Sequence, residues 1–419
     1  MKRIIAIILA GLMLICFCSC GNNSNDDSTS SESEVSTMNS EVTSNTPSTE
    51  SVSSETKKPF VAPDPINFTE GGIEYIKYHA DDISLFKYCG HWQAEDPNTP
   101  HTLSCYWNIA YVELDFTGDH IFIELTKPSN FKVSIDGSEY TEHSANGYYK
   151  ITAASKGNHT LRIFNNVNHN NVYFGGAAVP TTEKMTRTAD KAHYVQFIGD
   201  SISMDARSFP FYSGVELGWD YAVAAQGAMS LRNGVGYLYT QKSSPDVLSR
   251  IGKSVGMETA FLKLGYPMEV MSDERKDFYG TYFDNDAINY NFETGYAPDI
   301  VFIFIGTNDG LVDHSHVYDF KTKYAAFVDK ILAMYGNETT VVMMNGVSTS
   351  GRDTTARYDC IRAAAEECIK NHPDNIKFID RDILETWNIE ISDDNTHPSG
   401  NGYATLCTRV TEYLADNFQ

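Results

Sequence analysis

Two patterns of apolar and polar residues follow each other along the chain, and the change falls near residue 185. Residues 75–179 contain short runs in which apolar and polar side chains alternate, as in β-strands with one buried face. These runs are residues 111–117, 120–126, 131–135 and 159–164. Asp136 with Gly137 and Gly157 with Asn158 are the predicted turns between strands. We therefore expect residues 60–185 to form an antiparallel β-sandwich of the jelly-roll type.

From residue 190 onward, short apolar runs alternate with longer amphipathic segments. The predicted strands are residues 194–198, 300–305, 340–344 and 376–379, and the predicted helices are residues 317–334, 355–369 and 401–415. Strands that are apolar throughout are typical of a parallel sheet covered by helices. The pattern therefore predicts a three-layer α/β domain over residues 190–419, with ligands bound at the carboxyl ends of its strands.

Residues 1–19 have the pattern of an export signal peptide. Two basic residues precede an apolar run, residues 4–17, which is shorter than the roughly 18 to 20 residues of a membrane-spanning helix. The run ends before Cys20 in a way that resembles a bacterial lipoprotein signal, in which the cysteine after the cleavage site carries lipid. We expect Cys20 to be a lipid anchor, and plain secretion is the alternative.

Residues 20–58 consist largely of Ser, Thr, Asn, Asp and Glu. Such a segment cannot bury enough apolar surface to offset its chain entropy, so we expect a disordered linker. A linker that starts at Cys20 would let the folded part reach substrate beyond the membrane surface. The expected location is the cell surface, with the lipid as the protein's membrane contact.

Charge and cysteine content exclude several classes of function. The formal net charge is -23, and a chain with this balance lacks the basic surface that nucleic acid binding needs. Neutral polysaccharides and small esters remain compatible with it. The cysteines after residue 20 form no CxxC pair, so the sequence contains no zinc motif, and Cys89 with Cys105 is the one disulfide considered against free buried thiols. The oligomeric state stays open.

Polar residues follow two of the predicted α/β strands. Gly199, Asp200 and Ser201 come directly after residues 194–198. A serine at this turn can expose its hydroxyl at the sheet edge, its own N–H can bind an oxyanion, and a helix beginning there would favour negative charge. A helix N-cap is the alternative role for this serine. Asn308 follows residues 300–305 in the same way and can donate its amide to an oxyanion, or it can serve as a turn residue.

A histidine with a nearby carboxylate precedes the last predicted helix. Asp394 stands three residues before His397, and in a tight loop this spacing lets the carboxylate accept a hydrogen bond from one ring nitrogen. The other ring nitrogen could then take a proton from Ser201. An inert surface loop is the alternative, and Asp393 competes with Asp394 as the partner of the histidine.

The ordered segments around Ser201, Asn308 and His397 resemble those of the SGNH (GDSL-type) hydrolase superfamily. The resemblance implies Ser201 as nucleophile, His397 as base, Asp394 as its partner, and an oxyanion hole from Ser201, Asn308 and a glycine N–H. By position the glycine is Gly227, with Gly234 or Gly236 as alternatives. Asp200 and Asp309, beside these residues, are interpreted as structural groups that hold loops through bonds from their side chains to the backbone.

The front half of the chain adds a second resemblance. A jelly-roll domain joined to an SGNH domain, with residues 116–118, 135–137 and 173–176 in its strands and turns, is similar to carbohydrate esterase family two. This implies an acetyl esterase for plant cell-wall polysaccharides such as xylan and glucomannan. It needs no metal or organic cofactor, and in some members a backbone carbonyl replaces the carboxylate beside the histidine.

Two other functions remain compatible with these residues. The protein could be a surface glycan-binding module with an inactive hydrolase domain, or a lipase or thioesterase for acyl chains. Residues 233–297 exceed what the core fold needs, and their role is not predicted.

Overall fold

The computed structural model describes residues 62–94, 99, 101–107, 109–165, 172–204, 208–227, 229–233, 235, 256–264, 289–292, 296–311, 313–349 and 354–418. The predicted export signal, Cys20 and the predicted linker lie outside the described residues. The chain from Phe60 to Gln419 forms one compact unit. Within the described part, no helix is both long enough and apolar enough to span a bilayer.

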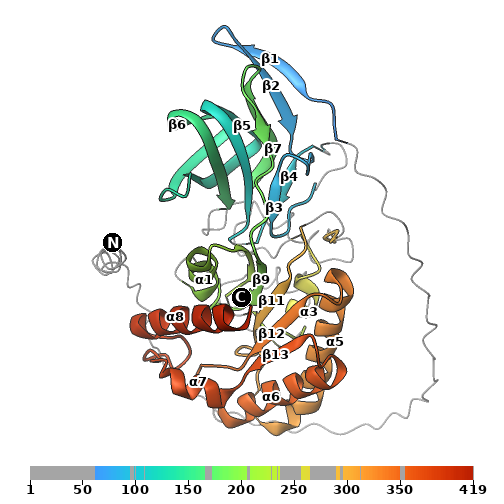
Figure 1. Cartoon of the computed structure of the whole chain (residues 1–419). Coiled ribbons are helices and arrows are strands. Elements are labelled where there is room, and N and C mark those ends of the chain that lie inside the picture. Colours follow the sequence, from blue (N-terminus) through green and yellow to red (C-terminus); the bar gives the residue numbers. More distant parts are fainter. Residues whose placement is uncertain are drawn as a thin grey trace, which may run out of the picture. The chain divides into compact units, whose positions relative to one another are not determined.

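The described strands β1–β8 form one antiparallel sheet in the N-terminal half, as expected from the alternating pattern (Figure 1). The strands are β1 (Ile66–Glu70), β2 (Ile73–His79), β3 (Lys87–Cys89), β4 (Leu103–Cys105), β5 (Tyr111–Ile135), β6 (Thr141–Asn165), β7 (Val172–Pro180) and β8 (Met185–Thr186). Their path runs β1-β2-β7-β5-β3, with β4 paired to β7 and with β6 and β8 paired to β5. The jelly-roll type and the domain boundaries stay predictions.

Strands β5 and β6 are longer than the sequence pattern indicates. Three of the predicted runs lie within β5, and the predicted turn at Gly157 and Asn158 is wrong. Gly157 instead pairs with Gly118 of β5, where the register shifts and Gly118 has a φ of 115°. A β-bulge therefore bends the ladder without ending it. The turn at Asp136 and Gly137 is confirmed, with φ angles of 55° and 74°.

The C-terminal half contains the predicted parallel sheet, in the order β10-β9-β11-β12-β13. The strands are β9 (Tyr194–Gly199), β10 (Asp220–Ala225), β11 (Ile300–Phe304), β12 (Thr340–Met344) and β13 (Ile376–Ile379). The helices are α1 (Phe209–Leu217), α3 (Met257–Ala260), α5 (Val317–Tyr335), α6 (Thr354–Asn371), α7 (Arg381–Trp387) and α8 (Gly400–Asn417). The sequence pattern missed β10, α1, α3 and α7, and it placed the other strands and helices of this half within two residues of their ends.

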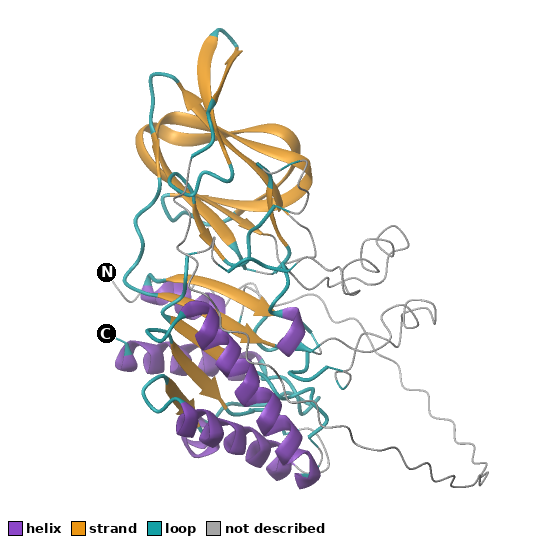
Figure 2. Ribbon diagram, turned by 90° about the vertical axis from the view of Figure 1, so that its right-hand side faces the viewer, coloured by secondary structure: helices purple, strands orange, loops and turns teal. Residues whose placement is uncertain are grey.

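Successive side chains of β11 enter two different apolar clusters. Ile303 packs in the cluster that contains Phe320 of α5 and Ile361 of α6. Phe302 packs in the cluster that contains Phe209 of α1 and Val410 of α8. Since neighbouring strand residues point to opposite faces, helices cover both faces of this sheet (Figure 2).

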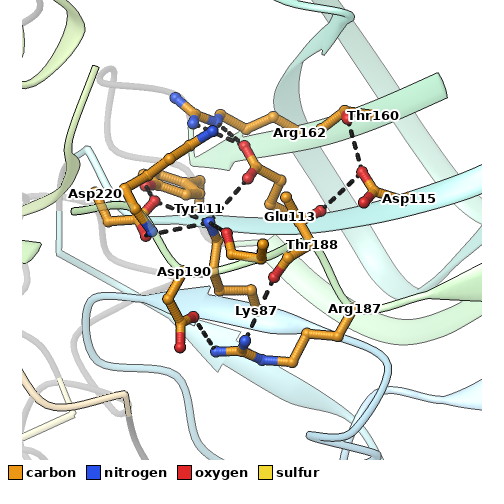
Figure 3. A network of polar contacts seen from close by, with 12 residues as sticks. Lys87, Tyr111, Glu113, Asp115, Thr160, Arg162, Arg187, Thr188, Asp190 and Asp220 are labelled. Atoms are coloured by element: carbon orange, nitrogen blue, oxygen red, sulfur yellow. Dashed lines mark hydrogen bonds and ion pairs between the residues drawn. The ribbon is translucent and has the colours of Figure 1, made fainter. Parts of the chain in front are cut away.

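A buried group of charged side chains joins the two sheets (Figure 3). Lys87 Nζ lies 2.9 Å from Asp220 Oδ1 and 3.0 Å from Glu113 Oε1. Arg162 Nη2 lies 2.7 Å from Glu113 Oε2, and the Tyr111 hydroxyl donates to Asp220 at 2.8 Å. Removing one member would leave a buried charge unpaired, which is strongly destabilising. The network therefore fixes β3, β5 and β6 against the first residue of β10.

Candidate active site

Ser201 lies two residues after β9, whose six residues are all buried. Asp200 closes the turn: its Oδ1 accepts the N–H of Ile202 at 3.0 Å, and its carbonyl accepts the N–H of Ser203 at 3.0 Å. A side chain at Gly199 would collide with Ser203 Oγ, which is why glycine suits this position. The sequence predicts that a helix begins at this turn, but α1, which follows β9, begins only at Phe209.

The ring of His397 joins Ser201 to Asp394. Nε2 of His397 lies 2.8 Å from Ser201 Oγ, and Nδ1 lies 2.7 Å from Asp394 Oδ2. When Nδ1 carries the proton and donates to the carboxylate, Nε2 is left as the acceptor that faces the hydroxyl. The three side chains therefore have the arrangement of a nucleophile, a base and a group that orients the base.

Asp394 is also tied to its own loop. Its Oδ1 accepts the N–H of Thr396 at 2.8 Å, the N–H of His397 at 2.9 Å and the hydroxyl of Ser392 at 2.7 Å. Partial burial raises the pKa of Asp394, but hydrogen bonds from His397, Thr396 and Ser392 outweigh it and hold this pKa well below its usual range. In this structure it is therefore the Asp394 carboxylate that faces the imidazole, and the exposed Asp393 does not take that position.

The two predicted oxyanion donors follow the strands on either side of β9. Asn308 comes after β11, and Gly227 comes two residues after the end of β10. Because the strands are parallel, all three turns lie at the same carboxyl edge of the sheet. Asn308 Nδ2 donates to the carbonyl of Met229 at 3.0 Å, and this bond orients the amide. Gly234 and Gly236 lie outside the described residues.

Asp309 makes the side-chain to backbone bonds that the sequence predicts for a structural residue. Its side chain is fully buried and accepts the N–H groups of Leu231 at 2.7 Å and Arg232 at 3.0 Å. The Arg232 side chain also bonds to Asp309 and pairs with Asp319 at 2.6 Å. Asp309 therefore fixes the segment that follows Gly227 to the turn that carries Asn308.

Sequence reasoning missed the contacts between the segment after β12 and the histidine loop. Ser348 Oγ donates to the carbonyl of Asn395 at 3.0 Å, and Thr349 Oγ1 donates to the same oxygen at 3.4 Å. Their partner lies 46 or 47 residues further along the chain, and a serine and a threonine after a strand resemble any polar turn. No local signal could have identified them.

The described residues offer no group of His, Cys, Asp and Glu side chains that could hold a metal ion. Cys89, Cys105, Cys360, Cys368 and Cys407 are free and buried, so the Cys89–Cys105 disulfide is absent. The four tryptophans are also buried: Trp92, Trp107, Trp219 and Trp387.

Comparison with protein families agrees with this geometry. Residues 279–405 match the GDSL-like Lipase/Acylhydrolase family, a range that includes Asn308, Asp394 and His397, whereas Ser201 precedes it. The chain thus contains a GDSL-like lipase/acylhydrolase domain. Residues 94–189 match the N-terminal domain of carbohydrate esterase 2, so the chain combines the two domains as the sequence resemblances implied. No curated protein has a significant match to the chain.

Three solved structures illustrate the shared fold. A family two carbohydrate esterase from Cellvibrio japonicus is 13% identical, with a TM-score of 0.58, over 82% of this chain and 98% of its own. A family two carbohydrate esterase from Clostridium thermocellum in complex with cellohexaose is 17% identical, with a TM-score of 0.55, over 79% and 98%. An acetyl xylan esterase from the rumen bacterium Butyrivibrio proteoclasticus is 12% identical, with a TM-score of 0.55, over 82% and 98%.

Proposed function

We propose that the protein is a serine esterase that removes O-acetyl groups from plant cell-wall polysaccharides such as acetylated xylan or glucomannan. The observation that carries this proposal is the hydrogen-bonded series from Ser201 through His397 to Asp394, at 2.8 Å and 2.7 Å. The sugar ligand of the Clostridium thermocellum enzyme and the activity of the Butyrivibrio proteoclasticus enzyme support a carbohydrate ester as the substrate.

The first half of the reaction acylates the enzyme. Ser201 Oγ attacks the acetyl carbonyl carbon while His397 Nε2 takes the hydroxyl proton. The resulting oxyanion accepts hydrogen bonds from the N–H groups of Ser201 and Gly227 and from the side chain of Asn308. The bond to the sugar oxygen then breaks, and His397 returns its proton to that oxygen, so that the polysaccharide leaves with a free hydroxyl group.

The second half frees the enzyme. His397 takes a proton from water, the water oxygen attacks the acetyl-serine carbonyl, and the same donors hold the second oxyanion. Collapse of this intermediate releases acetate and returns the proton to Ser201. Asp394 keeps the imidazole in the tautomer that both steps need. This two-step transfer requires neither a metal nor an organic cofactor.

We also propose that residues 1–19 direct export, that Cys20 carries lipid, and that residues 20–58 form a flexible linker to a jelly-roll domain and an SGNH domain. Such an arrangement would hold the esterase at the cell surface, where polymers too large for import are accessible. Plain secretion remains the alternative location.

The test is acetate release from acetylated xylan and acetylated glucomannan by the purified protein, with Ser201→Ala as the matched control. p-Nitrophenyl acetate and octanoate are assayed in parallel. Acetate release by the wild type alone supports the proposal and identifies the polymer. Activity confined to the octanoate ester would instead indicate a lipase or thioesterase, and glycan binding without hydrolysis of any ester would indicate an inactive binding module.

A further inference from the structure

A buried hydroxyl group from another segment of the chain contacts the loop that carries His397. Ser348 lies four residues after the end of β12, is fully buried, and donates through Oγ to the carbonyl of Asn395 at 3.0 Å. Thr349, its exposed neighbour, reaches the same oxygen over 3.4 Å. The bond from Ser348 is the shorter of the two and comes from a buried hydroxyl, so it is the stronger contact.

Asn395 is the residue of that loop with a left-handed backbone conformation. Its φ is 56°, in the left-handed region, and it stands between Asp394 and the two residues whose N–H groups Asp394 binds. Among residues with a side chain, asparagine adopts this conformation most readily, and backbone contacts on either side keep Asn395 in it. The N–H of Asn395 is held by the Ser392 carbonyl at 2.9 Å. Its carbonyl is held by Ser348.

Ser348 is itself fixed by helix α6. The hydroxyl of Tyr358 donates to the Ser348 carbonyl at 2.7 Å, and Arg357 Nη1 donates to the same oxygen at 3.4 Å. Arg357 is nearly buried and interacts electrostatically with Asp200, which precedes Ser201. Helix α6 therefore contacts the segment that holds the His397 loop, and its Arg357 also interacts with the turn that carries Ser201.

We propose that Ser348 is a positioning residue for the histidine: by holding the Asn395 carbonyl, its hydroxyl keeps Asp394 and His397 in register with Ser201. This inference rests on the proposed function. Ser348 acts through the loop and takes no part in the proton transfers. Its loss allows the loop to relax around Asn395, which lengthens the contacts of His397 without altering the surface that binds the ester.

The test compares Ser348→Ala with the matched control Thr349→Val, which removes the longer bond to the same carbonyl. For p-nitrophenyl acetate we expect Ser348→Ala to lower kcat by about 10-fold with KM within about 2-fold of the wild type, since small displacements of a base are costly to the rate. Thr349→Val should stay within about 2-fold in both. Melting temperatures of the variants show whether a loss comes from unfolding, and if Ser348→Ala does not fold, Ser348→Cys takes its place.

A second measurement does not depend on turnover. The proton that His397 Nδ1 shares with Asp394 is expected to give a downfield proton NMR resonance, which should weaken or shift in Ser348→Ala and remain in Thr349→Val. An unchanged kcat and an unchanged resonance in folded Ser348→Ala, with Ser201→Ala inactive, would overturn the inference and leave the esterase proposal intact. An inactive wild type would overturn the esterase proposal, and the resonance would still decide whether Ser348 positions His397.

Discussion

The carboxylate of Asp394 lies 2.7 Å from Nδ1 of His397 and also accepts the N–H of that same residue at 2.9 Å. Asp394 thus holds both the ring and the backbone of the histidine. Half of its side chain is exposed, so water competes for the carboxylate in a way that it cannot in a fully buried triad. The distances nevertheless identify Asp394 as the group that orients the His397 ring in this structure.

We expect Asp394→Asn to lower kcat for p-nitrophenyl acetate by about 10⁴-fold, because an amide that donates to Nδ1 stabilises the wrong tautomer. Asp393→Asn is the matched control, since it changes the same charge one position away. Steady-state kinetics on both variants check this. Similar kcat values for the two would show that the Asp394 carboxylate does not orient the ring.

The amide of Asn308 is already oriented by the Met229 carbonyl at 3.0 Å. An amide nitrogen carries two hydrogens, so one can hold the side chain while the other serves the oxyanion. We expect Asn308→Ala to reduce kcat by about 10² to 10³-fold, the usual effect of losing one oxyanion donor. Asn417→Ala, at the end of α8, is the control for losing an asparagine side chain. A wild-type rate in folded Asn308→Ala would remove Asn308 from the oxyanion hole.

The sequence predicted the residues at the carboxyl edge of the parallel sheet better than it predicted the segments that contact them. Strands such as β9 and β11 are largely apolar runs. Ser201 and Asn308 in the turns after them, and His397 before α8, belong to recognisable motifs, so these residues could be found locally. β10 was missed because its short run includes three alanines, which favour neither helix nor strand by pattern.

Contacts between distant segments could not be read from the chain. The bond from Ser348 to Asn395 and the ion pair of Lys87 with Asp220 join residues 47 and 133 positions apart. Periodicity reports which face of an element is buried, but it does not report which segment covers that face. The same limit explains the wrong turn at Gly157, where only the pairing with Gly118 shows a bend inside a continuous ladder.

Asp200 should make the stability of the protein depend on pH. Complete burial raises its pKa to about 6, although the Ile202 N–H and the Thr307 hydroxyl act to lower it. A carboxyl whose pKa rises on folding contributes stability below its unfolded pKa of 3.8 and loses that contribution as the pH rises through about 6. The ionised form therefore costs the folded state on the order of 3 kcal/mol at neutral pH.

We expect Asp200→Asn to abolish this dependence. Its free energy of unfolding, minus that of the wild type, should increase between pH 4 and pH 6, with a slope of up to about 1.4 kcal/mol per pH unit. Urea denaturation at several pH values gives the curve, and the exposed Asp393→Asn should run parallel to the wild type. Parallel curves for Asp200→Asn as well would show that the carboxyl stays close to its unfolded pKa.

Replacing Gly402, in the first turn of α8, by alanine should lower the stability of the protein, whereas the same change at an ordinary helical glycine raises it. Replacing glycine by alanine inside a helix usually stabilises a protein by up to about 1 kcal/mol. At Gly402, however, a Cβ atom would collide with the Glu390 carbonyl oxygen and lie 3.1 Å from Pro398 Cβ. Glu390 and Pro398 flank the loop of His397, and Ile391 pairs with Pro398.

We therefore expect Gly402→Ala to destabilise the protein by about 1 to 3 kcal/mol, as overpacking does, and to lower kcat at the same time by moving Pro398 next to His397. Urea denaturation and p-nitrophenyl acetate kinetics measure the two effects. Thr408→Ala, at an exposed position of the same helix, controls for helix propensity. A more stable Gly402→Ala with unchanged kcat would mean that the close contact between α8 and the histidine loop relaxes freely and does not set the position of His397.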